Sequence, residues 1–428
     1  MKRLANVELL GISRVCPRWH QLIMGTSCLW NCVDLDLRVW DDEFDPQLLT
    51  LLRVVLDHGG NFPLDLGVVC GDGEATSRGL NVLATYSCRW RNVSISAYGP
   101  QKHLRLPAIE GNLPLLENLA IEVAGLDEAG VIPFFQVAPR LATVRVRALT
   151  SNISKLPLEQ LKLLVFGDPE GPKELDDVTR IMTRLSGEVG IYLHLVGWEE
   201  QITAPRAEAS PQVSNAFELF IRGRNASQVS TEAADLAMQD FLARLTLPRL
   251  RTLYVDSTGR QLYFPMPWST DQFLALAHRS SFSTHLRTLI LFPVFITEAE
   301  LLQTLSSLDS LDDLTISDRK MINAEWGDLA VLTDSLLQHL TWTPGLGCVV
   351  PALRCFRCHT QLKFDDGLLR DFVLSRVRRE LASAFEVELL WDQDHHRELD
   401  SGMLAQFEEL SSRGELIFSA KPSALFQD

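Results

Sequence analysis

The residues best able to do chemistry are a cysteine and histidine cluster, Cys355, Cys358 and His359, with Cys348 nearby. The C-x-x-C-H spacing matches the pattern for haem attachment, and four such side chains could ligate zinc. A structural zinc site usually takes two separated ligand pairs, however, and the chain has no second C-x-x-C. Cys358 also occupies an apolar position of a predicted strand. We therefore predict neither a metal nor a cofactor.

Two further polar clusters lack the spacing of known sites. Asp392-Gln393-Asp394-His395-His396 groups carboxylates with imidazoles, but neighbours along a strand or helix point in different directions, which favours a solvated acidic turn. Gly71-Asp72-Gly73 lacks the spacing of a phosphate-binding loop and predicts a turn. No G-x-S-x-G elbow or H-E-x-x-H helix occurs. We therefore expect a binding protein that is not an enzyme, with a hydrolase or metalloprotein as the alternative.

Composition narrows the classes of partner. The chain has 428 residues, 46% hydrophobic and 22% charged, which is ordinary for a globular protein but long for one core. The net charge of −15 argues against nucleic acid as the main ligand. The segment from Phe385 onward contains ten acidic and three basic residues. This end is either a solvated acidic face or a dock for a basic partner.

The sequence predicts neither a secretory signal nor a membrane-spanning segment. The first 30 residues contain Lys2, Arg3, Arg14 and Arg18 among apolar positions, unlike a secretory signal. The longest apolar run, Leu289–Ile296, is interrupted by proline and is too short to cross a bilayer. Eight cysteines in a chain of this length do not indicate a disulfide framework. We expect a cytoplasmic or nuclear protein with no membrane partner.

A short pattern, L-x-x-L-x-L with substitutions, recurs along the chain. The last two apolar positions would lie on one face of a short strand, and the first would lie in the turn before it. One copy alone is weak evidence, but eight copies, half of them introduced by proline, indicate irregular leucine-rich repeats. The copies begin at Leu116, Leu141, Leu158, Leu250, Leu286, Leu311, Leu337 and Leu353.

Segments with helical periodicity lie between these strands. The clearest begins with a capping box at Thr297 and Glu300, and Glu174–Ser186 and Glu232–Leu245 show the same period. The alternation predicts an α/β fold, an irregular leucine-rich-repeat horseshoe or solenoid. A mixed α/β domain with scattered leucines is the alternative. Proline-containing stretches at Glu199–Gln212 and Gly259–Trp268 predict surface loops, which serve either as connectors or as contact sites.

The opening of the chain predicts two short helices. Val7–Gly25 carries a wide apolar stripe, but Pro17 would break a single long helix, so we place the break near Ser13–Pro17. Leu29 and Trp30 follow as a second apolar anchor, before an alternating stretch, Val33–Leu37. On physical grounds this segment is a helical cap that shields the first repeat.

The residue order resembles a known family. S-R-V-C-x-R-W from Ser13, then Leu29-Trp30 and Val33-Asp34-Leu35, is similar to the second half of the F-box in F-box-like leucine-rich-repeat proteins of mushroom-forming fungi. The resemblance is specific in Ser13–Leu37 and weaker elsewhere. It implies a truncated F-box-like module at 1–45, a cap with the first irregular repeats at 46–112, and a leucine-rich-repeat solenoid at 113–428.

By this resemblance the chain would be the substrate-recognition subunit of an SCF-type cullin-RING ubiquitin ligase. The N-terminal module would bind a Skp-type adaptor, and the repeats would bind a protein substrate whose identity the sequence does not reveal. The residues that match the motif's apolar positions, and that we expect at the adaptor, are Leu10, Ile12, Val15, Trp19, Leu29 and Trp30.

One departure from the family qualifies the ligase role. F-boxes begin with a Leu-Pro-containing helix upstream of the V-C-x-R-W segment, and the 14 residues before Val15 contain nothing like it. The expectation is therefore a fragment, an incomplete gene model or a copy that no longer binds the adaptor. A leucine-rich-repeat scaffold outside any ligase is the alternative function.

Overall fold

The computed structural model describes residues 7–40, 45–71, 73–97, 109, 111–123, 132–146, 151–167, 172–196, 210–224, 231–257, 266–292, 294–317, 330–377, 383–391 and 397–422. It divides into two compact units. Unit 1 comprises Met1–Pro169 with Asp176–Val189, and unit 2 comprises Glu170–Leu175 with Gly190–Asp428. Both units combine parallel strands with helices, so the fold is mixed α/β.

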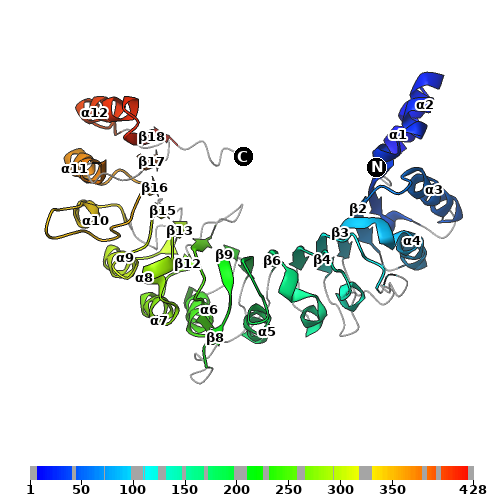
Figure 1. The fold of residues 1–428 in the computed structure, drawn as a ribbon, viewed down its shortest axis with the longest axis horizontal. Helices are drawn as coiled ribbons and strands as arrows, with labels where there is room; N and C mark the ends of the chain where they lie inside the picture. The colour runs from blue at the N-terminus through cyan, green and yellow to red at the C-terminus, as the bar shows by residue number, and fades with distance from the viewer. Residues whose placement is uncertain are drawn as a thin grey trace. The chain divides into compact units, whose positions relative to one another are not determined.

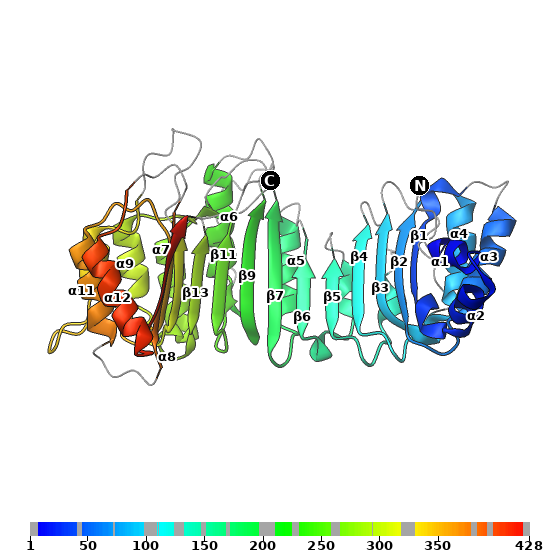
Figure 2. The ribbon, with the colours of Figure 1, turned by 90° about the horizontal axis from the view of Figure 1, so that it is seen from above.

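Unit 1 is built on a parallel sheet with the strand order β1-β2-β3-β4-β5-β6 (Figures 1 and 2). Because alternate residues along a strand point to opposite faces, one face is apolar and packed, as in the buried register Val33, Leu66, Val93, Leu119 and Val144. We call the opposite face the open face. The strands are β1 (Cys32–Asp36), β2 (Leu64–Cys70), β3 (Trp90–Ala97), β4 (Asn118–Val123), β5 (Thr143–Val146) and β6 (Leu163–Phe166).

Helical crossovers join the first of these strands, as parallel neighbours require. The sheet continues without a break across the expected boundaries at residues 45 and 112, since β1 pairs with β2 and β3 with β4. The helices of this part are α1 (Val7–Ser13), α2 (Pro17–Gly25), α3 (Asp45–His58) and α4 (Glu74–Ala84). Short 3-10 helices are η1 (Ser27–Trp30), η2 (Leu37–Val39), η3 (Ser87–Arg89), η5 (Ile132–Phe135), η6 (Ser151–Lys155) and η7 (Leu158–Gln160).

Unit 2 repeats the strand and helix alternation. Its main strands are parallel and side by side, in the order β7-β9-β11-β13-β15-β16-β17-β18 (Figure 2). They are β7 (Val189–Val196), β9 (Ala216–Arg224), β11 (Thr252–Asp256), β13 (Thr288–Phe292), β15 (Asp313–Ser317), β16 (Cys355–His359), β17 (Phe385–Trp391) and β18 (Leu416–Pro422). Two small parallel pairs join β8 (Gln212–Val213) to β10 (Leu245–Thr246) and β12 (Met266–Pro267) to β14 (Val294–Phe295).

The helices follow the apolar periods of the sequence. In α5 (Pro172–Met182), which contains residues of both units, Leu175, Val178 and Ile181 are buried as predicted. The capping box is confirmed: the Thr297 N–H donates to Glu300 Oε2 at 2.8 Å, and the Glu300 N–H donates to Thr297 Oγ1 at 3.3 Å. The other helices are α6 (Thr231–Ala243), α7 (Thr270–Ser280), α8 (Phe282–His285), α9 (Glu298–Leu305), α10 (Asp334–Leu340), α11 (Asp366–Val377) and α12 (Ser401–Ser412).

Six of the eight repeat copies are confirmed as turn-then-strand units. In β11, for example, Leu253 and Val255 are buried on one strand face, while Leu250 lies before the strand with its N–H donating to the Leu247 carbonyl at 3.2 Å. The buried first leucine therefore anchors the turn into each strand. The confirmed copies begin at Leu116, Leu141, Leu250, Leu286, Leu311 and Leu353.

Two copies were placed wrongly. The copy at Leu337 lies on α10, because Thr333 caps a helix there by accepting from the Leu336 N–H at 3.2 Å. The copy at Leu158 is shifted by three residues: β6 begins at Leu163, and Leu164 and Phe166 supply the buried positions. The pattern in β6 is therefore Leu161-x-x-Leu164-x-Phe166.

Two buried arginines, Arg89 and Arg376, and the half-buried Arg279 cap the C-terminal ends of helices. Arg89 Nη1 donates to the Leu56 carbonyl at the end of α3, at 2.8 Å. Arg279 Nη2 donates to the Leu242 and Ala243 carbonyls of α6, at 3.0 and 3.2 Å. Arg376 Nε donates to the Leu340 carbonyl of α10, at 3.0 Å. Helix C-termini leave four carbonyls without intrahelical partners, and these three capping arginines satisfy some of them from a later part of the chain.

Candidate functional site

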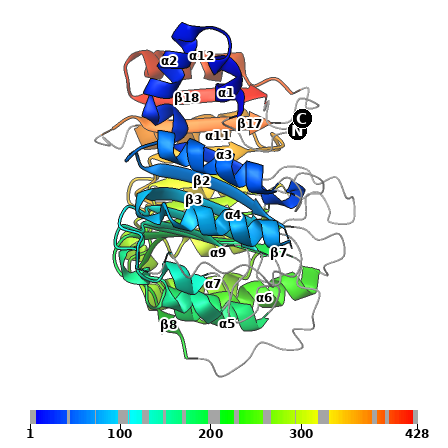
Figure 3. The same ribbon diagram turned by 90° about the vertical axis from the view of Figure 1, so that its right-hand side faces the viewer.

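The N-terminal helices α1 and α2 project from the β1 end of unit 1, beyond α3 (Figures 1 and 3). The predicted break between them is confirmed: α1 ends at Ser13, Cys16 is extended, and Pro17 begins α2, where its missing N–H costs nothing. The Ser13 hydroxyl donates to the Leu10 carbonyl at 2.8 Å and ends the first helix. The two helices therefore form a short bent pair.

Three of the six apolar residues predicted to contact an adaptor are exposed on this pair or in the turn between its helices. Val15 is 70% exposed, Trp19 51% and Ile12 39%, whereas Leu10 is half-buried. Leu29, in η1, is 39% exposed. Single exposed apolar residues are normal on a surface, whereas several within one short segment are candidates for an interaction site.

Trp30 is the exception among the six residues. It has no exposed surface, its Nε1 donates to the Ile23 carbonyl at 2.8 Å, and its ring centroid lies 5.3 Å from that of His58 on α3. A side chain without exposed surface cannot contact a partner in this conformation. The expectation that Trp30 is an adaptor contact is therefore replaced by a packing role.

Leu22 belongs to the apolar stripe predicted for this segment but is not among the residues expected at the adaptor. Leu22 is 56% exposed and follows Trp19 by three residues, so both lie on the same side of α2. Ile23, the neighbouring residue, is buried at 4% exposure. The apolar stripe predicted for this segment therefore splits into a packed side and an exposed side. We call Ile12, Val15, Trp19 and Leu22 the exposed helical cluster.

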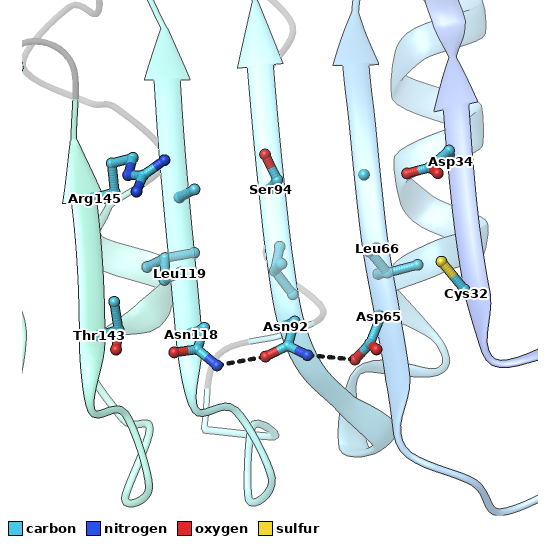
Figure 4. A pocket seen from close by; sticks show the side chains of 13 residues that line it. Cys32, Asp34, Asp65, Leu66, Asn92, Ser94, Asn118, Leu119, Thr143 and Arg145 are labelled. Atoms are coloured by element: carbon cyan, nitrogen blue, oxygen red, sulfur yellow. Dashed lines mark hydrogen bonds between the residues drawn. The ribbon is translucent and has the colours of Figure 1, made fainter. Parts of the chain in front are cut away.

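A second feature of unit 1 is a shallow groove across the open face of β1–β5, with a volume of about 360 Å³ (Figure 4). Register places its open-face side chains in two rows. The first row is Cys32, Asp65, Asn92, Asn118 and Thr143, and the second is Asp34, Gly67, Ser94, Ala120 and Arg145. The small residues in the centre of the second row make the depression.

Three residues of the first row, Asp65, Asn92 and Asn118, form a hydrogen-bonded ladder. Asn118 Nδ2 donates to Asn92 Oδ1 at 2.5 Å, and Asn92 Nδ2 donates to Asp65 Oδ1 at 2.7 Å (Figure 4). Arg91 holds the other end, with Nη2 donating to Asp65 Oδ2 at 2.9 Å. A carboxylate that accepts from both neighbours fixes the orientation of the amides along the ladder.

The second row ends in opposite charges. Asp34 and Arg145 are both exposed and lie at the two ends of the groove (Figure 4). A Cβ built on Gly67 would lie 2.2 Å from Asp34 Oδ1, so the carboxylate lies over the glycine. Burial, with smaller contributions from the charges of Asp34 and Asp65, raises the pKa of the Cys32 thiol. The β1 end of the groove is therefore the negative end.

Three aromatic residues form a row on neighbouring strands of unit 2: Tyr192 on β7, Phe220 on β9 and Tyr254 on β11. The Tyr192 and Phe220 rings stack at 3.9 Å with an interplanar angle of 5°, and Phe220 lies 5.4 Å from Tyr254. Beside them Arg222 Nη2 lies 2.9 Å from Oδ2 of buried Asp256. The sequence analysis missed this row, because isolated aromatic residues in a strand usually indicate buried core positions.

The C-x-x-C-H motif, Cys355–His359, lies on β16. Cys355 and Cys358 are three residues apart on a strand, so their side chains point to opposite faces. Burial is the largest cause that raises the pKa of Cys355 to about 12, which keeps it a thiol. Within the described ranges no group of three or more His, Cys, Asp or Glu residues is placed to hold a metal ion.

Several predicted features lie outside the described residues. These are Asp392–His396, Asp72 of the predicted turn, and most of the two loop stretches, residues 199–209 and 259–265. No helix in the described part of the chain combines the length and apolar character that a bilayer crossing requires. No protein-family model matches this chain, and no curated protein sequence matches it either.

Proposed function

We propose that this chain is an irregular leucine-rich-repeat horseshoe that begins with an F-box-like remnant. In this proposal it acts without catalysis of its own, as the substrate-recognition subunit of an SCF-type ubiquitin ligase. The exposed helical cluster binds a Skp-type adaptor, and open-face residues of the repeats bind a protein substrate.

The observation that carries the proposal is the exposure of Val15 and Trp19. Both match apolar positions of the F-box-like motif, and both remain at least half exposed although unit 1 offers a large apolar core. Covering such side chains is worth about 1.5–3 kcal/mol each. Tryptophan is also among the residue types that most often dominate binding energy at interfaces.

Co-purification with a recombinant Skp-type adaptor tests this role. The wild-type chain should retain the adaptor, and Val15→Asp and Trp19→Ala should each lose it. Val54→Asp is the matched control, because Val54 is 38% exposed on α3, in the same unit but outside the cluster. An adaptor that binds none of the four chains, or all of them equally, contradicts the ligase role.

A capping role without a ligase is the second candidate. It is favoured by the burial of Trp30 and Ile23, whose hydrogen bond packs one side of the helical pair against the start of unit 1. Under this alternative, loss of the pair lowers the free energy of unfolding of the first repeat. Substitution of exposed Val15 would then change neither the stability nor any binding partner.

A further inference from the structure

The groove in unit 1 is suited to a ligand longer than a single small molecule. It crosses five strands, and neighbouring strands lie about 4.8 Å apart, so the backbones of Asp34 and Arg145 are separated by about 19 Å across the sheet, with the Asp34 carboxylate reaching inward over Gly67. An extended peptide advances about 3.3 Å per residue and spans the same distance in six residues.

The two end charges are available for such a ligand. Within the described residues neither Asp34 nor Arg145 forms an ion pair, in contrast to Asp65, which Arg91 neutralises at 2.9 Å. A peptide with a cation at one end and a carboxylate at the other would complement them. Opposite charges across an interface favour the correct register and disfavour other partners.

The centre of the groove favours small side chains and backbone contacts. Ser94 and Ala120 leave room for the peptide to approach the sheet, whereas the Asp34 carboxylate occupies the space above Gly67. Beside them, the Asn92 and Asn118 side chains each use one N–H within the ladder, and an amide retains a second N–H and oxygen lone pairs. Peptide groups supply the complementary acceptors and donors.

We propose that this groove binds an extended peptide segment that lies across β1–β5. A Lys or Arg of the segment pairs with Asp34, and an Asp or Glu six residues away pairs with Arg145. The residues between them that face the sheet, two and four positions along, are Gly, Ala or Ser. The inference rests on the proposed function only in taking this segment to be part of the protein substrate.

Fluorescence anisotropy with two labelled heptapeptides tests the inference. The first peptide has Lys at position 1, Glu at position 7, and Gly and Ser at positions 3 and 5. The second differs only in carrying Glu at both ends. At low salt the wild-type chain should bind the first peptide about tenfold more tightly, and raised salt should reduce the difference.

Reversing the charge of Asp34 then distinguishes ion pairing from nonspecific binding. Asp34→Lys should invert the preference and favour the second peptide, whereas Glu122→Gln, on the open face of β4 outside the groove, should leave it unchanged. Urea unfolding of both variants checks that unit 1 stays folded. Equal binding of the two peptides by the wild type, or an unchanged preference in Asp34→Lys, overturns the inference.

The outcome is independent of the adaptor experiment. Lost peptide preference with intact adaptor capture removes the groove as the substrate site and leaves the ligase role. Peptide preference without adaptor capture leaves the groove as the peptide site of a scaffold protein.

Discussion

Replacement of Arg376 by methionine should destabilise unit 2 locally. Arg376 has no exposed surface, and its guanidinium donates to the Leu340 carbonyl at 3.0 Å, the Val350 carbonyl at 3.0 Å and the Val349 carbonyl at 3.1 Å. Methionine keeps most of the side-chain stem and removes every donor. The substitution therefore isolates the capping hydrogen bonds from the packing.

The expected loss can be worked out from these contacts. A buried polar group that loses its partner costs about 1–3 kcal/mol, so three carbonyls give a gross cost of about 3–9 kcal/mol. Removing a buried guanidinium returns part of that cost, because the charge no longer has to be desolvated. We expect a net loss of about 3 kcal/mol in the free energy that opens the end of α10.

Native-state hydrogen exchange is the appropriate assay, because stacked repeats can open locally without global unfolding. The α10 and α11 amides should exchange on the order of 100-fold faster in Arg376→Met, by the conversion of 1.4 kcal/mol per tenfold. Arg370→Met is the control: Arg370 lies on the same helix, is 46% exposed and pairs with adjacent Asp371. Equal exchange in the two variants refutes the capping assignment.

Three other substitutions or reactions test separate parts of the structure. Trp30→Phe should cost about 1 kcal/mol by removing the Nε1 donor to Ile23, measured as faster amide exchange in α2; unchanged exchange would contradict this packing role. Thr297→Ala should lower the stability of α9 by about 1 kcal/mol through loss of its cap, read from the urea midpoint. In the folded chain at pH 8, Cys32 should be alkylated more slowly than Cys88, although both are exposed, because the raised pKa of Cys32 leaves less thiolate; mass spectrometry of the two labelled peptides decides.

Where the recurring turn-and-strand pattern is made of leucines, the position of the strand could be predicted from sequence. Leu250, Leu253 and Val255 all occupy the buried positions that spacing alone assigns to a turn and a strand. Copies with other residues were missed for a physical reason. Trp90-x-x-Val93-x-Ile95 buries the same three positions in β3, since the core accepts any apolar side chain of suitable volume.

The groove could not be predicted in the same way. Asp34, Gly67 and Arg145 are far apart in the chain and become neighbours only through the register of five strands. A slip of one residue would turn each of them into the core. Likewise, apolar residues such as Trp19 and Trp30 look alike in sequence, and only the packing against α3 separates the exposed one from the buried one.

The Trp30 side chain has a mechanical consequence for unit 1. It is bonded to the backbone of α2 and packed against a ring of α3, so a single residue pins the projecting helices to the first repeat. Reorientation of the helical pair relative to the sheet would therefore have to break the Trp30 hydrogen bond and its ring contact. While these contacts hold, a partner bound to the exposed helical cluster and a peptide bound in the groove would stay at a constant distance from each other.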